Sequence, residues 1–159
     1  MLKPLLHNKL NRAEAEKILA TEKFNRLVIS FYRYVEIENA KALRNLLFEE
    51  WSKLNVLGRV YLASEGINAQ VSIPEPLLNR FRNLVDSVAS LKGVAFNFGA
   101  EKSKLSFYKL AIKVKKQIVA DGLKEVDFDL NNIGKKLSAL DWNKKMDDGA
   151  IVVDMRNHY

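Results

Sequence analysis

Two short alternating runs joined by a tight polar link constrain this chain more than any other feature of its sequence. The runs are Arg59 to Leu62 and Asn68 to Ile73, and each places apolar side chains at every second residue. Such alternation is typical of half-buried strands, and a short link that contains glycine is typical of a hairpin turn. We therefore predict an antiparallel hairpin whose turn is Ala63 to Gly66, with Gly66 supplying a backbone conformation that other residues resist.

The hairpin is flanked on each side by one strand pattern and one helix pattern. Before it, Leu27 to Tyr34 is rich in β-branched and aromatic residues, and Asn39 to Leu54 has an apolar stripe at helical spacing. After it, a second helix follows Pro76, and Phe107 to Val119 alternates as a last strand. This order predicts an α+β fold, the ferredoxin-like or acylphosphatase-like βαββαβ sandwich, with Val94 to Phe98 as a candidate extra strand.

The flanking regions predict additional parts. Asn11 to Lys23 reads as a short helix capped by Asn11, while 131–139 and 141–146 read as short lysine-rich helices. Ala150 to Asp154 reads as a buried strand that lacks neighbours, as expected at the start of a truncated domain. The expected divisions are an N-terminal helical extension at 1–24, a ferredoxin-like domain at 25–120, a helical connector at 121–147 and the truncated domain at 148–159.

Composition narrows the class of protein. The chain has no cysteine, which removes thiolate nucleophiles and cysteine-based metal sites, and which fits a reducing compartment. No apolar run approaches the length of a membrane span, so we expect a cytoplasmic protein. The formal charge of +7 favours polyanionic partners such as RNA.

Alternation sorts the side chains of each predicted strand between the two faces of the sheet. Apolar residues such as Ile29, Val60 and Val71 should face the helices, and Val114 should join them. Ser72 should lie on the opposite, open face. The candidate site on this open face comprises Tyr32, Tyr34, Arg59, Tyr61, Asn68, Gln70, Phe107, Lys109, Lys113 and Lys115.

This set of side chains suits single-stranded RNA. Aromatic rings stack on bases for ~1–3 kcal/mol each, cations hold phosphates, and amides pair with the edges of splayed bases. A plainer interpretation is that these are ordinary strand formers and that lysines guard a sheet edge. The face would then be covered by the N-terminal helix or by another domain.

Catalytic patterns are sparse in the sequence. Glu65 has no second acid, base or metal ligand close to it, so we expect it to serve the turn. His7 and His158 lie at opposite ends of the sequence, which does not suggest a triad or a metal site. Acylphosphatase-type chemistry would use Arg33 and Asn68, but the glycine-rich loop that would cradle a phosphate is missing before the first strand.

Four blocks in register carry a resemblance to a known family. They are VISFYRY, GRVYLASEGINAQVS, IKVKKQIVADG and IVVDMRNHY, and an LHN triplet lies near the start. Together they closely resemble the bacterial tRNA uridine hydroxylases that contain a rhodanese domain. The resemblance runs over nearly the whole chain, and Glu65 and Gly66 fall in the family's signature loop.

The resemblance implies that the parent protein hydroxylates the wobble uridine of certain tRNAs to 5-hydroxyuridine, with molecular oxygen as co-substrate. It implies that IVVDMRNHY begins a rhodanese domain, in which Asp154 and Arg156 would be framework residues. The family's catalytic cysteine would lie beyond Tyr159, so we expect no catalytic residue in this chain and no activity from the chain alone. The residues indicate no metal, and any further cofactor stays open.

Three hypotheses follow for this portion. In the leading one, it positions the tRNA anticodon arm for the protein's own rhodanese domain. In the second, the parent is a sulfurtransferase whose rhodanese cysteine carries a persulfide. In the third, this portion is a scaffold that packs on the rhodanese domain without touching RNA.

Overall fold

The computed structural model describes residues 11–99, 107–118 and 134–154. Its contacts divide the chain into two compact units, Met1–Glu125 and Val126–Tyr159. The two histidines, His7 and His158, lie outside the described residues.

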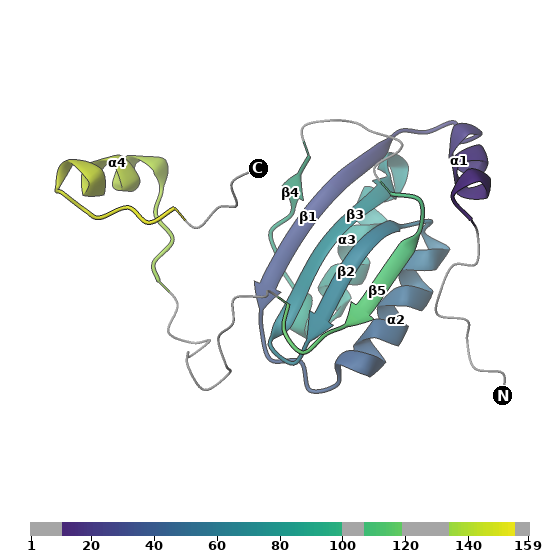
Figure 1. The fold of residues 1–159 in the computed structure, drawn as a ribbon, viewed down its shortest axis with the longest axis horizontal. Helices are drawn as coiled ribbons and strands as arrows, with labels where there is room; N and C mark the ends of the chain where they lie inside the picture. The colour runs from purple at the N-terminus through teal and green to yellow at the C-terminus, as the bar shows by residue number, and fades with distance from the viewer. Residues whose placement is uncertain (1–10, 100–106, 119–133, 155–159) are drawn as a thin grey trace. The chain divides into compact units, whose positions relative to one another are not determined.

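A five-stranded sheet organises the first unit, with the strands side by side in the order β4-β1-β3-β2-β5 (Figure 1). Each neighbouring pair is antiparallel except β2 and β5, which are parallel. The strands are β1 (Arg26–Tyr34), β2 (Leu57–Ala63), β3 (Gly66–Pro74), β4 (Asn97–Phe98) and β5 (Leu110–Val114). The first four strands in this order form the ferredoxin-like arrangement, which confirms the predicted fold class.

The last two strands have exchanged the roles predicted from the sequence. The short β4, expected as an extra strand, pairs with β1 through Ile29 and Phe98 and completes the βαββαβ unit. The run expected to complete it instead supplies β5, which adds to the far side of β2. Alternation identifies a strand but carries no information about its partner.

The extent of β5 also differs from the prediction. The strand covers Leu110–Val114, so Phe107 lies outside it. Val114 was expected to be buried but is 39% exposed, because it ends β5, an edge strand with a neighbour on one side only. Lys115 follows the strand and keeps it paired, since its amide donates to the Leu62 carbonyl at 2.7 Å.

The hairpin forms where the sequence predicted it. β2 ends at Ala63, β3 begins at Gly66, and only Ser64 and Glu65 link them. Gly66 has a φ of +147°, and a Cβ atom there would run into the carbonyl oxygen of Arg33 on β1. Glycine is therefore required by both the backbone angle and the close approach of the neighbouring strand.

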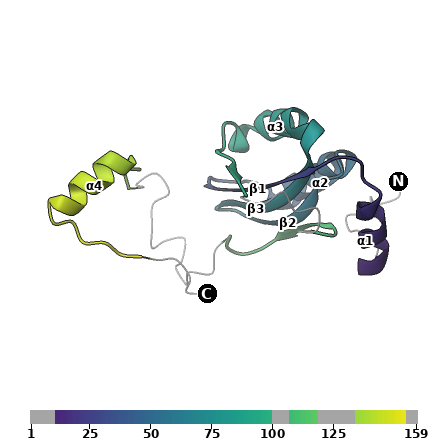
Figure 2. The same cartoon turned by 90° about the horizontal axis from the view of Figure 1, so that it is seen from above.

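Helices α2 (Ala40–Lys53) and α3 (Leu78–Ser87) cover one face of the sheet (Figure 2). α2 begins at an N-cap, Asn39, whose side chain accepts from the Ala42 amide. Two 3₁₀ turns, η1 (Glu75–Leu77) and η2 (Ala89–Leu91), flank α3. α1 (Arg12–Ala20) is separate from this layer and starts with the expected Asn11 cap, in a capping box with Glu14.

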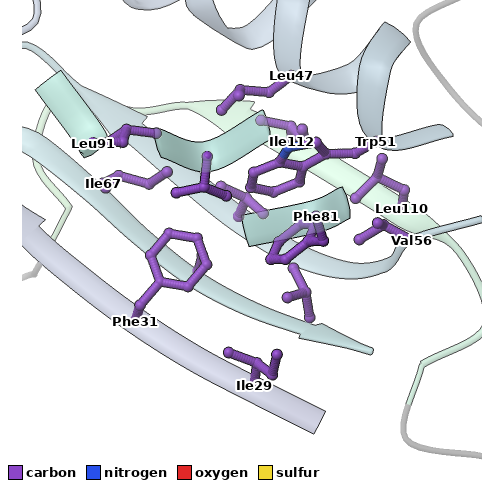
Figure 3. Packing of buried hydrophobic residues seen from close by; sticks show 14 of the residues in the cluster. Ile29, Phe31, Leu47, Trp51, Val56, Ile67, Phe81, Leu91, Leu110 and Ile112 are labelled. Atoms are coloured by element: carbon purple, nitrogen blue, oxygen red, sulfur yellow. The ribbon is translucent and has the colours of Figure 1, made fainter. Parts of the chain in front are cut away.

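Aromatic side chains fill the space between these helices and the sheet (Figure 3). The fully buried Trp51 ring lies 5.1 Å from that of Phe81 and 6.3 Å from that of Phe31, measured between ring centroids. Phe31 also stacks on Phe96 at 5.1 Å. The helix face of the sheet is thus a packed core in which Ile29, Val60 and Val71 point as predicted.

The second unit contains one described helix, α4 (Ala139–Asp147), capped by Ser138. The predicted helix at 131–139 is wrong over its described part, because 134–138 is not helical, and 131–133 lies outside the described residues. The predicted buried strand is also wrong: 150–154 forms no strand, and Ile151 is 92% exposed. A strand needs a partner for its backbone groups, and none of the described strands pairs with this segment.

Candidate functional site

A single row of side chains crosses the open face of the sheet from β1 to β5. Tyr32 pairs with Asn68, Asn68 with Tyr61, and Tyr61 with Lys113. Residues paired in register project to the same face, so an aromatic ring, an amide, a second ring and an ammonium group follow one another across four strands. We call these four residues the central row.

A second row, one pleat away, is more polar. It runs from Ser30 through Gln70 and Arg59 to Ala111. Gln70 and Arg59 are both exposed. Neither this row nor the central row contains a carboxylate, so the described cations on this face have no acidic neighbour in register.

Two contacts orient the rings of the central row. The Tyr32 side chain is 64% exposed, and its ring meets that of Tyr34 edge-on, at 6.4 Å between centroids and 88° between planes. Despite this contact, most of the Tyr32 side chain stays open to a ligand. The ring of the half-buried Tyr61 has the Lys115 ammonium 5.6 Å from its centroid, a cation–π contact that holds a positive charge beside it.

The structure brings most of the predicted site residues together but not all. Phe107 is half-buried and lies before β5, outside the rows. Lys109 is exposed immediately before β5, and its carbonyl accepts from the Gly58 amide. Ser72, expected on the open surface, is fully buried beside Arg26, whose guanidinium donates to the Ser72 carbonyl.

Glu65 lies in the turn as expected, and its side chain makes a further contact that its sequence position did not reveal. The side chain is only 5% exposed, and its Oε1 accepts from the Ile118 amide at 2.7 Å. Its backbone carbonyl accepts from the Val35 amide at 2.9 Å, and that of Ser64 accepts from the Ile37 amide at 2.8 Å. The hairpin tip therefore fastens both the loop after β1 and the segment after β5, an arrangement that we call the Glu65 clasp.

The residues considered for acylphosphatase-type chemistry are separated by the sheet. Arg33 pairs with the buried Ile67 and projects to the helix face, where its Nη1 donates to the carbonyls of Lys92 at 2.8 Å and Ser90 at 3.3 Å. Asn68 belongs to the central row on the opposite face. The two side chains cannot contact one phosphate group from opposite sides of a sheet.

A cavity of about 350 Å³ lies beside α1 and is lined in part by Leu19 and Arg26. Arg26 is 1% exposed and donates to both carboxylate oxygens of Glu22 at 2.8 Å. It also donates to the carbonyls of Asn55 and Ser72. Because every nitrogen of this guanidinium already has a partner, the ion pair serves the fold and presents no vacant donor to a ligand.

The described residues contain neither a cluster of metal ligands nor a membrane-spanning helix. Within 11–99, 107–118 and 134–154, His, Asp and Glu side chains form no cluster of three that could hold a metal ion. In the same ranges, every helix is too short or too polar to cross a membrane.

Comparison with known proteins places the chain in a family. Residues 26–118 match the family described as UPF0176 acylphosphatase like domain. A curated protein of Leptospira interrogans (serogroup Icterohaemorrhagiae, serovar Lai) named tRNA uridine(34) hydroxylase is 50% identical over 155 residues, which is 97% of this chain and 42% of that protein. Proteins of the same name from Cronobacter sakazakii and Escherichia coli (strain SE11) are 42% and 41% identical, each over 98% of this chain and 45% of their own length.

This chain therefore spans less than half the length of these curated relatives. The family match extends from the start of β1 to the residue held by the Glu65 clasp, so it coincides with the sheet and its two covering helices. Since the match covers more than half of the chain, the protein belongs to the UPF0176 acylphosphatase-like domain family, and its relatives named tRNA uridine(34) hydroxylase confirm the resemblance seen in the sequence.

Proposed function

We propose that this chain is the tRNA-positioning part of an enzyme that hydroxylates uridine 34 of tRNA. The central row carries the proposal, because it combines the groups that bind bases and phosphates on one exposed surface. The formal charge of +7 supports an anionic partner. The names of the curated relatives indicate that this partner is tRNA.

The reaction of the whole enzyme belongs to the same proposal. Molecular oxygen serves as co-substrate, the product is 5-hydroxyuridine, and the catalytic cysteine lies in a rhodanese domain outside this chain. The protein acts in the cytoplasm, where it meets the anticodon arm of its tRNA. This chain has no cysteine, so by itself it binds tRNA without converting it.

The proposed domain layout has a core at 25–120, preceded by an extension at 1–24 and followed by a connector at 121–147. Residues 148–159 begin the rhodanese domain. The exposed apolar side chains of the second unit, including Trp142 and Ile151, support a partner domain for this region, since large apolar groups are normally covered.

The test is binding of tRNA to this chain across a salt series, comparing wild type with Tyr61→Ala and Lys113→Ala. We expect binding that weakens as salt rises, because cations displace counterions from phosphates. Lys113→Ala should reduce the slope of log affinity against log salt by about one, and Tyr61→Ala should weaken binding at every salt concentration.

The other hypotheses predict different results. Absence of tRNA binding by the wild-type chain would refute the positioning role and favour the scaffold. A longer protein that forms a persulfide and consumes no oxygen would favour the sulfurtransferase. Detection of 5-hydroxyuridine produced by this chain alone would contradict the location of the catalytic group.

A further inference from the structure

The spacing of the central row defines the kind of RNA that it can take. Resting on the proposed function, we propose that the open face binds two unstacked nucleotides of a single-stranded RNA loop, one base on Tyr32 and the other on Tyr61, with their phosphates toward β5. The geometry of the sheet supports each part of this assignment.

The two rings are separated by one intervening strand. Tyr32 on β1 and Tyr61 on β2 both pair with Asn68 on β3. Adjacent strands lie ~4.8 Å apart, so the two backbone positions are about 10 Å from each other. Consecutive stacked nucleotides are separated by only ~3.4 Å along the helix axis. Two bases that stack on these two rings must therefore be unstacked from each other. A duplex, whose bases stay stacked, cannot place bases on both rings of the central row.

The cations give the bound RNA a direction across the sheet. Lys113 is paired with Tyr61, and Lys115 lies over the same ring, while Tyr32 is paired with the uncharged Asn68. Both lysines are exposed on β5 or directly after it. Phosphates should therefore track the β5 edge, and the nucleotide on Tyr61 is the one anchored by charge.

Asn68 lies between the two rings and is half-buried. Its amide has one acceptor and two donors, which is the equipment needed to read a base edge. A splayed base on either side brings its hydrogen-bonding edge toward this amide. Asn68 is thus the candidate specificity residue, while the rings accept any base.

The experiment compares a short labelled single-stranded RNA with the same strand annealed to its complement, measured by fluorescence anisotropy with this chain. We expect the single strand to bind at least tenfold more tightly than the duplex. Tyr32→Ala and Tyr61→Ala should each weaken single-strand binding by about five- to 150-fold, the range of one lost base stack. The double variant should show the product of the two effects, because each ring holds a different base.

Phe98→Ala provides the matched control. Phe98 is 57% exposed but pairs with Ile29 and so projects to the helix face. Its removal should leave affinity unchanged. Melting temperatures of all variants exclude unfolding as the cause of any loss.

The outcomes separate this inference from the proposed function. If the wild-type chain binds neither tRNA nor the single strand, the proposed function fails. If tRNA binds but the duplex binds as tightly as the single strand, or Tyr32→Ala has no more effect than Phe98→Ala, only the two-nucleotide assignment is overturned. Equal loss in the single and double variants would likewise overturn the two-nucleotide assignment, because the two rings would then not hold separate bases.

Discussion

The two faces of one sheet differ in what their residues contribute. On the helix face, Phe31 packs against Trp51 and is 1% exposed. One residue further along the same strand, Tyr32 is 64% exposed and touches Tyr34 on its own face. Neighbouring aromatic residues therefore have separate duties: the first supplies burial, and the second is available for a ligand. Stability and binding should consequently respond to different substitutions.

Trp51→Ala should have the largest effect on stability. Removing a fully buried indole leaves a cavity between α2 and the sheet and should lower the free energy of unfolding by ~3–5 kcal/mol. Chemical denaturation measures the change. If this variant were as stable as wild type, the helix face would not be the core that its burial indicates.

Arg26→Met should cause the second-largest loss of stability. The substitution leaves the carboxylate of Glu22, which is 12% exposed, without its guanidinium partner, and it removes donors from two carbonyls. We expect a loss of up to about 3 kcal/mol, smaller than for a wholly buried pair because water reaches Glu22. Denaturation of the double variant Glu22→Gln/Arg26→Met would test the cause, since removing both charges should recover part of the loss.

Glu65→Ala should cost less, at ~1–3 kcal/mol, because it leaves the buried Ile118 amide without an acceptor. Glu65→Gln is the matched control, since its amide oxygen can still accept this hydrogen bond. Hydrogen exchange at Ile118 should quicken in the alanine variant and change little in the glutamine variant. Equal exchange in both variants would show that the clasp does not depend on this acceptor.

The smallest effect on stability should come from the open face. Tyr32→Ala and Lys113→Ala remove exposed side chains, so the free energy of unfolding should change by no more than about 0.5 kcal/mol. Their affinity for RNA should nevertheless fall. A large loss of stability in Tyr32→Ala would erase the contrast between the faces and make this ring part of the fold.

Local pattern predicted much of this fold. Alternation placed Ile29, Val60 and Val71 on the helix face and most of the candidate site on the other, because a strand's period forces successive side chains apart. The cap at Asn11 could be predicted because it acts on an amide only three residues away, and the cap that the structure shows at Asn39 has the same spacing.

The features that the sequence did not reveal depend on contacts between residues far apart in the chain. The exchange of β4 and β5 is decided by which edge each strand pairs with, and alternation is the same at either edge. Burial of Glu65 depends on Ile118, which is distant in sequence, so no spacing rule could find it. Alternation sorted Tyr32, Tyr61 and Asn68 to the open face but misplaced Phe107 and Ser72, and the order of rings and charge along the central row required the strand register.

The glycines of the hairpin have a consequence for how this sequence can diverge. At Gly66 a side chain would collide with the Arg33 carbonyl, and at Gly58, whose φ is +150°, one would collide with the Gln70 carbonyl. Selection for folding alone therefore keeps both positions fixed, whatever happens to the substrate. A descendant that lost Tyr32 and Lys113 would still need these glycines to fold, so the glycines report the shape of the hairpin, while Tyr32 and Lys113 report only the RNA binding proposed for the open face.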